Sequence, residues 1–133
     1  MDKIQKVRLL LEKKNSKVNP EIISLDVGCL VRNARNTSDD KPTDGSSWKE
    51  YWQIHTGEDF PKTCPLCGNT LSEDEVDGCH VNIAFTAPTN SGYRFSYKKY
   101  IIPGHHACNM QLGEECNIHC SIKAVEAIKN YKG

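Results

Sequence analysis

The sequence has no long hydrophobic run and no excess of charge of either sign. No stretch approaches the roughly 20 apolar residues of a membrane-spanning helix, and the first residues lack the uninterrupted apolar region of a signal peptide. We therefore expect a cytoplasmic protein without a membrane partner. Seventeen basic and seventeen acidic side chains cancel, so no overall field attracts the chain to nucleic acid. Any contact with a polyanion has to be local.

Hydrophobic residues are scarce as well, at 38% of 133 residues, which is thin for a self-sufficient core in the single domain that this length predicts. Seven cysteines, an odd number in a chain without an export signal, favour metal binding and free thiols over disulfides. A structural zinc ion would compensate for the small core, because its binding contributes about 10–16 kcal/mol, more than the net stability of a typical domain.

Two pairs of metal-ligating residues are the most informative feature of the chain. Cys64 and Cys67 form a C-x-x-C motif in TCPLCGN, and His105 and Cys108 follow in PGHHACN. A C-x-x-C motif on a tight turn lets two thiolates converge, and residues three apart in the first turn of a helix share a face. The two pairs predict one tetrahedral Zn²⁺ site, with His106 as the alternative to His105.

A second metal site is an open alternative near the C-terminus. Cys116, His119 and Cys120 lie close in sequence, and Cys79 or a spare histidine could complete a set of four ligands. No second knuckle motif accompanies them. We therefore favour a single zinc ion.

The segments before the knuckle predict two helices and a loop. Residues 2–14 place Ile4, Val7 and Leu11 on one helical face. This helix either docks on the body, which we favour, or forms a homodimer with a second copy. Residues 33–47 are rich in polar residues and predict a loop.

A short aromatic helix is expected next. Ser46 or Ser47 can cap it, and Gly57 can end it. Trp48 and Trp52 share one face of this helix and are interpreted as core residues rather than as surfaces for stacking nucleobases.

After the knuckle, residues 79–86 and 93–102 predict a β-hairpin. In the second strand the aromatic residues Tyr93, Phe95 and Tyr97 alternate with polar and basic ones. Such alternation is typical of a half-buried strand, which we favour, and also of a surface that binds nucleic acid.

A helix over residues 118–131 is predicted at the C-terminal end. Ile118, Ile122, Val125 and Ile128 repeat at helical spacing, and this periodicity is the reason for the prediction.

Three segments carry a resemblance to a known family. They are C-P-L-C-G from Cys64, C-H-V from Cys79, and Y-I-I-P from Tyr100 leading to H-H-A-C-N. In this order, residues 64 to about 115 resemble the zinc-bearing HNH, or ββα-metal, nuclease superfamily. The resemblance implies an α+β fold with a zinc-stabilised treble-clef core over about residues 60–115, flanked by the predicted helices.

The resemblance also implies an activity, metal-dependent cleavage of phosphodiester bonds in DNA or RNA. His80 matches the position of the general base of the family. Asn109 matches a position that helps to bind a catalytic cation such as Mg²⁺, separate from the structural Zn²⁺. The basic residues near the nucleic-acid backbone would be Arg94, Lys98 and Lys99.

One position departs from the family. Cys79 stands where the family has aspartate directly before the histidine, and a thiolate is a poor ligand for Mg²⁺. Asp77 is the alternative cation ligand. His80 is alternatively a residue packed against the knuckle or a zinc ligand. A second function stays open for these reasons, a non-catalytic zinc module that binds nucleic acid or a protein partner.

Overall fold

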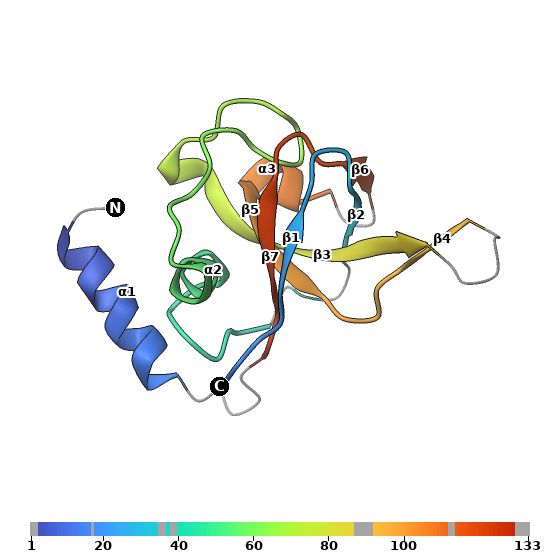
Figure 1. The fold of residues 1–133 in the computed structure, drawn as a ribbon. Coiled ribbons are helices and arrows are strands. Elements are labelled where there is room, and N and C mark those ends of the chain that lie inside the picture. Colours follow the sequence, from blue (N-terminus) through green and yellow to red (C-terminus); the bar gives the residue numbers. More distant parts are fainter. Residues whose placement is uncertain are drawn as a thin grey trace.

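The computed structural model describes residues 3–16, 18–34, 37, 40–86, 92–111 and 114–129. Within these residues the fold is mixed α/β, with helices packed around one curled antiparallel sheet (Figure 1). No helix in these ranges is long and apolar enough to cross a membrane. The helical elements are α1 (Lys3–Asn15), α2 (Trp48–Thr56), the 3₁₀ turn η1 (Glu73–Glu75) and α3 (His106–Asn109).

Seven strands form the sheet in the described part of the chain, in the order β1-β7-β5-β3-β2-β6, with β4 paired to β3. Their bounds are β1 (Ile22–Leu25), β2 (Leu30–Asn33), β3 (Val76–Thr86), β4 (Tyr93–Phe95), β5 (Tyr100–His105), β6 (Glu115–Asn117) and β7 (Ile122–Glu126). The long strand β3 pairs with β5 from Val76 opposite His105 to Val81 opposite Tyr100. This register brings the start of β3 beside the chain that leads into α3.

The predicted β-hairpin is present in a modified form. The second run of residues is divided into β4 and β5, and both pair antiparallel with β3. Asn82 in β3 donates from Nδ2 to the carbonyl oxygens of Ser96 and Lys98. The segment between β4 and β5 is therefore held against β3 by side-chain hydrogen bonds.

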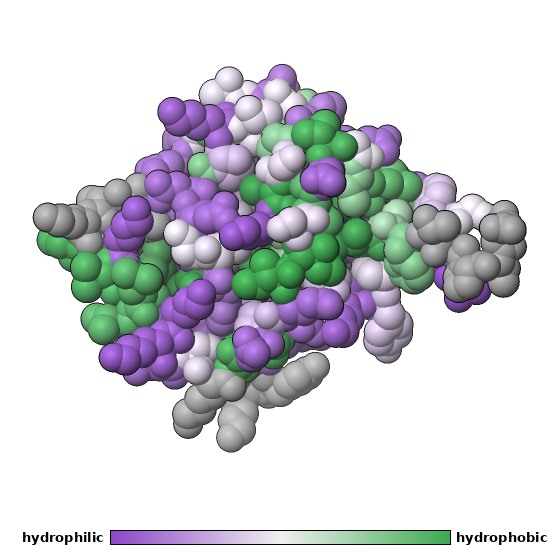
Figure 2. Space-filling view, viewed as in Figure 1, coloured by the Kyte–Doolittle hydropathy of each residue, from purple (hydrophilic) through white to green (hydrophobic). Residues whose placement is uncertain are grey.

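Helix α1 forms where it was predicted, but it docks on α2 with a different face. Leu9 is its buried residue, Arg8 pairs with Glu50 at 2.9 Å, and Lys13 Nζ donates to the carbonyl oxygen of His55. The apolar residues expected to make the contact are exposed instead: Ile4, Val7 and Leu11. Part of this apolar surface is visible over α1 in Figure 2.

Helix α2 carries the predicted core anchors and both predicted end signals. Ser47 caps its first turn by accepting the backbone N–H of Glu50, and Gly57 ends it at φ +69°, a conformation that glycine adopts without steric cost. Trp52 is fully buried and donates from Nε1 to the carbonyl oxygen of Lys123 at 2.8 Å. The hydroxyl of Tyr51 donates to the carbonyl oxygen of Glu126.

The predicted helix over residues 118–131 is wrong, because residues 122–126 form strand β7. This strand lies between β1 and β5, with Ile22 opposite Val125 and Ile101 opposite the same residue. Helical periodicity was misleading because β7 is buried on both sides, so apolar residues occur on both faces. In the predicted loop 33–47, Asn33 belongs to β2; the described residues after it contain an isolated bridge between Pro42 and Lys129.

Candidate metal centre

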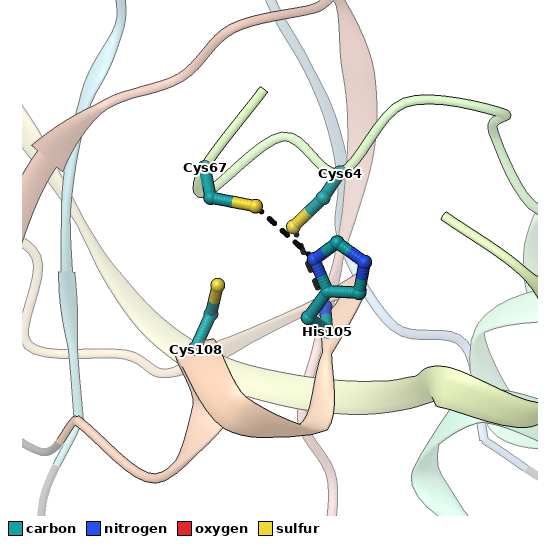
Figure 3. Close-up of side chains that lie close together, drawn as sticks. All are labelled: Cys64, Cys67, His105 and Cys108. Carbon is teal, nitrogen blue, oxygen red and sulfur yellow. Dashed lines mark hydrogen bonds between the residues drawn. The ribbon is translucent and has the colours of Figure 1, made fainter. Parts of the chain in front are cut away.

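A tight turn shapes the first pair of candidate ligands. Thr63 and Thr70 form an isolated antiparallel bridge, and the N–H of Gly68 donates to the carbonyl oxygen of Cys64 at 2.8 Å. Gly68 has φ +80°, in the left-handed region that favours glycine. This turn directs the side chains of Cys64 and Cys67 toward the same point (Figure 3).

The second pair comes from the junction of β5 and α3. His105 is the last residue of β5 and Cys108 lies in α3, and their side chains face the knuckle (Figure 3). The four ligand atoms all lie within 4.8 Å of one another. We call these four residues the thiol cluster. They could hold a metal ion such as zinc, because three sulfurs and one imidazole nitrogen are a set that zinc accepts tetrahedrally.

Neighbouring groups prepare His105 for this role. Its Nε2 lies 2.9 Å from the carbonyl oxygen of Thr70 and 3.2 Å from Oε2 of Glu75. Both partners are acceptors, so they favour the proton on Nε2 and leave the lone pair on Nδ1, which lies 3.1 Å from Sγ of Cys67. Metal-bound histidines in proteins commonly have such a partner on the other ring nitrogen. The residues present therefore fit a zinc ion.

The thiols of the cluster differ in how readily they lose their protons. Burial raises the pKa of Cys67, but a hydrogen bond from the backbone of Asn69, joined by one from His105 when its Nδ1 carries a proton instead of a metal ion, outweighs it and the pKa falls to about 7. Burial and the neighbouring Cys64 raise the pKa of Cys108 to about 12. Thiolates are the ligand form, so metal binding and proton release are coupled. A set of four protein ligands leaves no open position, which is typical of a structural site.

A second group of polar residues lies directly beside the thiol cluster. His106 places Nδ1 2.6 Å from Oδ2 of Asp77, and Asn109 donates from Nδ2 to the same oxygen at 3.0 Å. We call these three residues the Asp77 cluster. His106 is therefore not assigned as the zinc ligand, because its ring contacts Asp77.

The Asp77 cluster borders two cavities. One, of about 300 Å³, is lined by Asp77 and Asn109 together with Lys41 and Lys49. The other, of about 670 Å³, is lined by Asp77 and His106 with Glu75 and Lys49 among its further residues. The Asp77 cluster is therefore open to a ligand.

Comparison of the chain with protein-family models, with curated proteins and with solved structures finds no match.

His80 lies apart from both clusters. It is 6% exposed, its ring meets the ring of Trp48 edge-on at 4.7 Å, and its Nε2 has no hydrogen-bond partner among the described residues. Burial lowers its pKa to about 4. His80 and Asp77 are three residues apart in a regular strand, so they project to opposite faces. The family resemblance implied that His80 and Asn109 share one site. The structure does not bring these two residues together.

The other cysteines and histidines do not form a second cluster in the described residues, where the thiol cluster is the group with metal-site geometry. Cys120 donates from Sγ to the carbonyl oxygen of Thr63, and the N–H of His119 donates to the carbonyl oxygen of Pro65. Cys116 lies in β6. Cys79 is fully buried and its pKa is raised, chiefly by that burial. These residues support the knuckle and the core.

The three predicted basic residues lie beside the middle and the far end of β3. Arg94 is exposed in β4, opposite Phe85. Lys98 forms ion pairs with Glu126 at 3.5 Å and with Glu21 at 3.9 Å, while Lys99 is half-buried. From Asp77 to Phe85, β3 rises by about 26 Å at about 3.3 Å per residue. Arg94 is thus distant from the Asp77 cluster, whereas Lys98 and Lys99 lie just before Tyr100, which pairs with Val81 in the middle of β3.

Sequence reasoning missed one buried residue that holds the site together. Asn33 in β2 donates from Nδ2 to the carbonyl oxygens of Cys108 and Gln111, each at 2.8 Å. These bonds add to the backbone bonds of the turn after α3, in which Cys108 O accepts from the N–H of Gln111 and Gln111 O accepts from the N–H of Glu114. No local signal identifies Asn33, because its partners lie 75 and 78 residues away in the chain.

Proposed function

We propose that the protein is a zinc-stapled, HNH-like phosphodiesterase that acts on DNA or RNA through the Asp77 cluster. The observation that carries the proposal is the shared carboxylate oxygen of Asp77, bonded by both His106 and Asn109. The order of knuckle, antiparallel strands and ligand-bearing helix supports a treble-clef core. Asp77, two residues before the position where the family has aspartate, supplies the missing carboxylate.

The residues of the Asp77 cluster suit this chemistry. Asp77 and the amide oxygen of Asn109 are hard oxygen ligands of the type that Mg²⁺ or Mn²⁺ prefers. A divalent cation held there would stabilise the negative charge that develops on the phosphate. His106 is exposed and is oriented by Asp77 through Nδ1, which leaves Nε2 to accept a proton from an attacking water.

The smaller cavity supports a phosphate-bearing substrate. Lys41 and Lys49 line it together with Asp77 and Asn109. Two ammonium groups and the carboxylates of Asp40 and Asp77 give the cavity charges of both signs, which suit an anionic group and a cation. His80 takes no part in this proposal, because it is buried on the other face of β3.

The test is a cleavage assay with purified, zinc-loaded protein. Plasmid DNA and single-stranded RNA are incubated with Mg²⁺, Mn²⁺, Ni²⁺ or EDTA, and zinc content is measured alongside. We expect Asp77→Asn and His106→Ala each to reduce the rate of cleavage by at least about 100-fold. A general base typically contributes this much or more to the rate. Glu73→Gln, which changes an exposed carboxylate outside both clusters, is the matched control and should cleave normally.

The proposal fails if no metal supports cleavage that Asp77→Asn abolishes. If His80→Ala abolishes cleavage and His106→Ala does not, the base is His80 as the resemblance implied, and the assignment to His106 is wrong. Both variants are compared only after zinc content and folding are shown to be unchanged.

A second candidate function is a non-catalytic zinc module that binds nucleic acid or a protein. One observation favours it: the imidazole at the position of the family's base is buried without a hydrogen-bond partner among the described residues. This candidate predicts one equivalent of zinc and binding without cleavage in every metal tested.

A further inference from the structure

The β3–β4 end of the sheet exposes aromatic side chains that a half-buried strand would cover. Phe85 is 50% exposed, Tyr93 is 55% exposed and Tyr97 is fully exposed. Figure 1 shows that β4 and the end of β3 project beyond the rest of the sheet. Large exposed aromatic groups that lie together are uncommon on a protein surface without a partner. We define the hairpin surface as these residues and their neighbours: Arg32, Phe85, Tyr93, Arg94, Phe95 and Tyr97.

The strand register sorts these residues onto two faces. Residues directly opposite each other in an antiparallel pair share a face. Arg32 pairs with Asn82 and Phe95 with Ala84, so Arg32 and Phe95 lie on one face.

Tyr93 belongs to that same face, since it is two residues from Phe95 along β4. Phe85 and Arg94 are directly opposite each other and lie on the other face. Each face of the hairpin therefore combines aromatic and arginine side chains.

The contacts on the first face are those of a stacking platform. The Arg32 guanidinium carbon lies 4.3 Å from the centre of the Phe95 ring, and the Tyr93 and Phe95 rings meet edge-on at 5.6 Å. The Tyr93 hydroxyl donates to Glu115 at 3.2 Å, which fixes the ring in one orientation. The rings are thus held in place before any ligand arrives.

The charge of the hairpin surface identifies the chemistry of its partner. Arg32 and Arg94 contribute positive charge, and Glu115 is a carboxylate that adjoins the surface and is engaged by Tyr93. Planar guanidinium groups bind phosphates and stack on aromatic faces. A ligand with both negative charge and flat aromatic groups satisfies these residues together.

We propose that the hairpin surface binds single-stranded nucleic acid on its first face, with bases stacked on Tyr93, Phe95 and Tyr97 and with Arg32 on a backbone phosphate. A double helix does not fit, because its base faces are already stacked and only unpaired bases present them to a protein. This inference rests on the proposed function, because it names the form of nucleic acid on which the phosphodiesterase would act. Binding of that nucleic acid can be measured without cleavage. A strand that also reaches the Asp77 cluster follows β3 for about 26 Å.

The test is fluorescence anisotropy with zinc-loaded protein and no added Mg²⁺ or Mn²⁺. The probes are a labelled 20-nucleotide oligo-dT, the equivalent oligo-U, and a 20-base-pair duplex. We expect tighter binding of at least one single strand than of the duplex. Tyr93→Leu and Tyr97→Leu should each weaken single-strand binding by about tenfold, since each removes one stacking ring. Tyr93→Phe and Tyr97→Phe keep the rings and should bind within about twofold of the unchanged protein.

Salt dependence provides a second measurement. Arg32→Gln should reduce the slope of log affinity against log salt by about 0.7, the value for one phosphate contact on a single strand, whereas Arg94→Gln, on the other face, should leave the slope unchanged. Leu10→Ala, which shortens an exposed side chain on α1, is the matched control and should leave affinity and slope unchanged.

Several outcomes overturn the inference: equal or tighter binding of the duplex, binding by the Tyr→Leu variants that matches the unchanged protein, or no binding of either single strand. In the last case the aromatic residues instead serve a protein partner. Cleavage without single-strand binding at the hairpin surface defeats this inference alone. Binding without cleavage supports the inference and defeats only the proposed phosphodiesterase.

Discussion

The thiol cluster and the Asp77 cluster share one turn of helix and differ in almost everything else. His105 and Cys108 serve the first, while His106 and Asn109, each one residue later, serve the second. Because one residue rotates an α-helix by about 100°, the two pairs face different directions. The first set is rich in sulfur and uses four protein ligands; the second offers oxygen and nitrogen atoms beside two cavities.

A small chain can in this way place stability and chemistry in separate groups of residues. Soft sulfur ligands select zinc, and carboxylate or amide oxygens select harder cations. A closed tetrahedral site stabilises the fold, whereas an open site can bind a substrate. If the comparison is correct, changes in the thiol cluster should destabilise the protein, and changes in the Asp77 cluster should leave it folded.

The largest expected effect comes from Cys108→Ser. Loss of one thiolate should release zinc and remove most of the about 10 kcal/mol or more that structural zinc contributes, so the variant should be unfolded. Zinc analysis and circular dichroism measure both results. Cys29→Ser, outside the cluster, and Asp77→Asn should retain zinc and fold. A Cys108→Ser protein that folds normally without zinc would remove the basis of the comparison.

Gly78→Ala should disturb the cavity beside the Asp77 cluster while sparing the thiol cluster. A methyl group at this position would lie 2.5 Å from the carbonyl carbon of Trp48 and 2.6 Å from the nitrogen of Lys49. Backbone atoms cannot move aside as a side chain can, so α2 must shift, at a cost of about 3 kcal/mol. Urea unfolding measures the loss, with zinc content unchanged.

Gly104→Ala is the matched control for this substitution. Its methyl group would meet side-chain atoms of Cys79 and Leu66 at 3.1 Å, and these can adjust. It should therefore cost less than Gly78→Ala. If both substitutions lower the free energy of unfolding equally, the close contact between α2 and β3 at Gly78 is not the reason that Gly78→Ala destabilises the protein.

Lowering the pH should reduce the free energy of unfolding through His80, which belongs to neither cluster. Its pKa is about 4 in the folded protein against an ordinary value of 6.5, so between these values the unfolded chain binds a proton that the folded chain does not. Stability is therefore full above pH 6.5 and falls as the pH is lowered toward 4. Between pH 7.5 and 5.0 the free energy of unfolding should drop by about 2 kcal/mol from this residue.

The matched variant is His80→Phe, which keeps a ring beside Trp48 and does not titrate. Urea unfolding at both pH values is compared for the two proteins, because protonation of the thiol cluster affects them alike. An identical pH dependence would mean that His80 is accessible in the folded state, and would return it to consideration as a base.

The smallest effect is expected from Glu75→Gln. Glu75 accepts from His105 Nε2 but is largely exposed and shares this role with the carbonyl oxygen of Thr70. Zinc affinity, measured by competition with a chelator, should fall by about tenfold. This is the lower end of the loss expected when a residue that hydrogen-bonds to a metal ligand is removed. Glu73→Gln, in the same 3₁₀ turn, is the control. Equal affinity for all three proteins would indicate that Thr70 alone orients the ring.

The sequence predicts those parts of the molecule that local interactions determine. The four ligands of the thiol cluster follow from spacing on a knuckle and on a helical turn, and α2 follows from its cap at Ser47 and its end at Gly57. Helix α1 was also predicted, but the face that it docks was not, because long polar side chains such as Arg8 make the contact.

Parts that depend on distant pairing were not predictable. Strand β7 has apolar residues at helical spacing, yet it becomes a strand because β1 and β5 lie on either side of it, with Ile22 paired to Val125 across 103 positions of the chain. The bond from Asn109 to Asp77 is similarly non-local. Along β3, Asp77 lies two residues before the position where the family has aspartate. Asp77 and Asn109 meet only because α3 lies at the start of β3.

The sheet order also constrains how the protein is made. Strand β1 is synthesised early, but its partner in the sheet is β7, so β1 stays unpaired until the ribosome has released residue 126. All members of the thiol cluster leave the ribosome earlier, by residue 108. Zinc can therefore organise the knuckle before β7 is available to pair with β1 and β5. Amides of β1 should accordingly gain protection from hydrogen exchange after those of the knuckle.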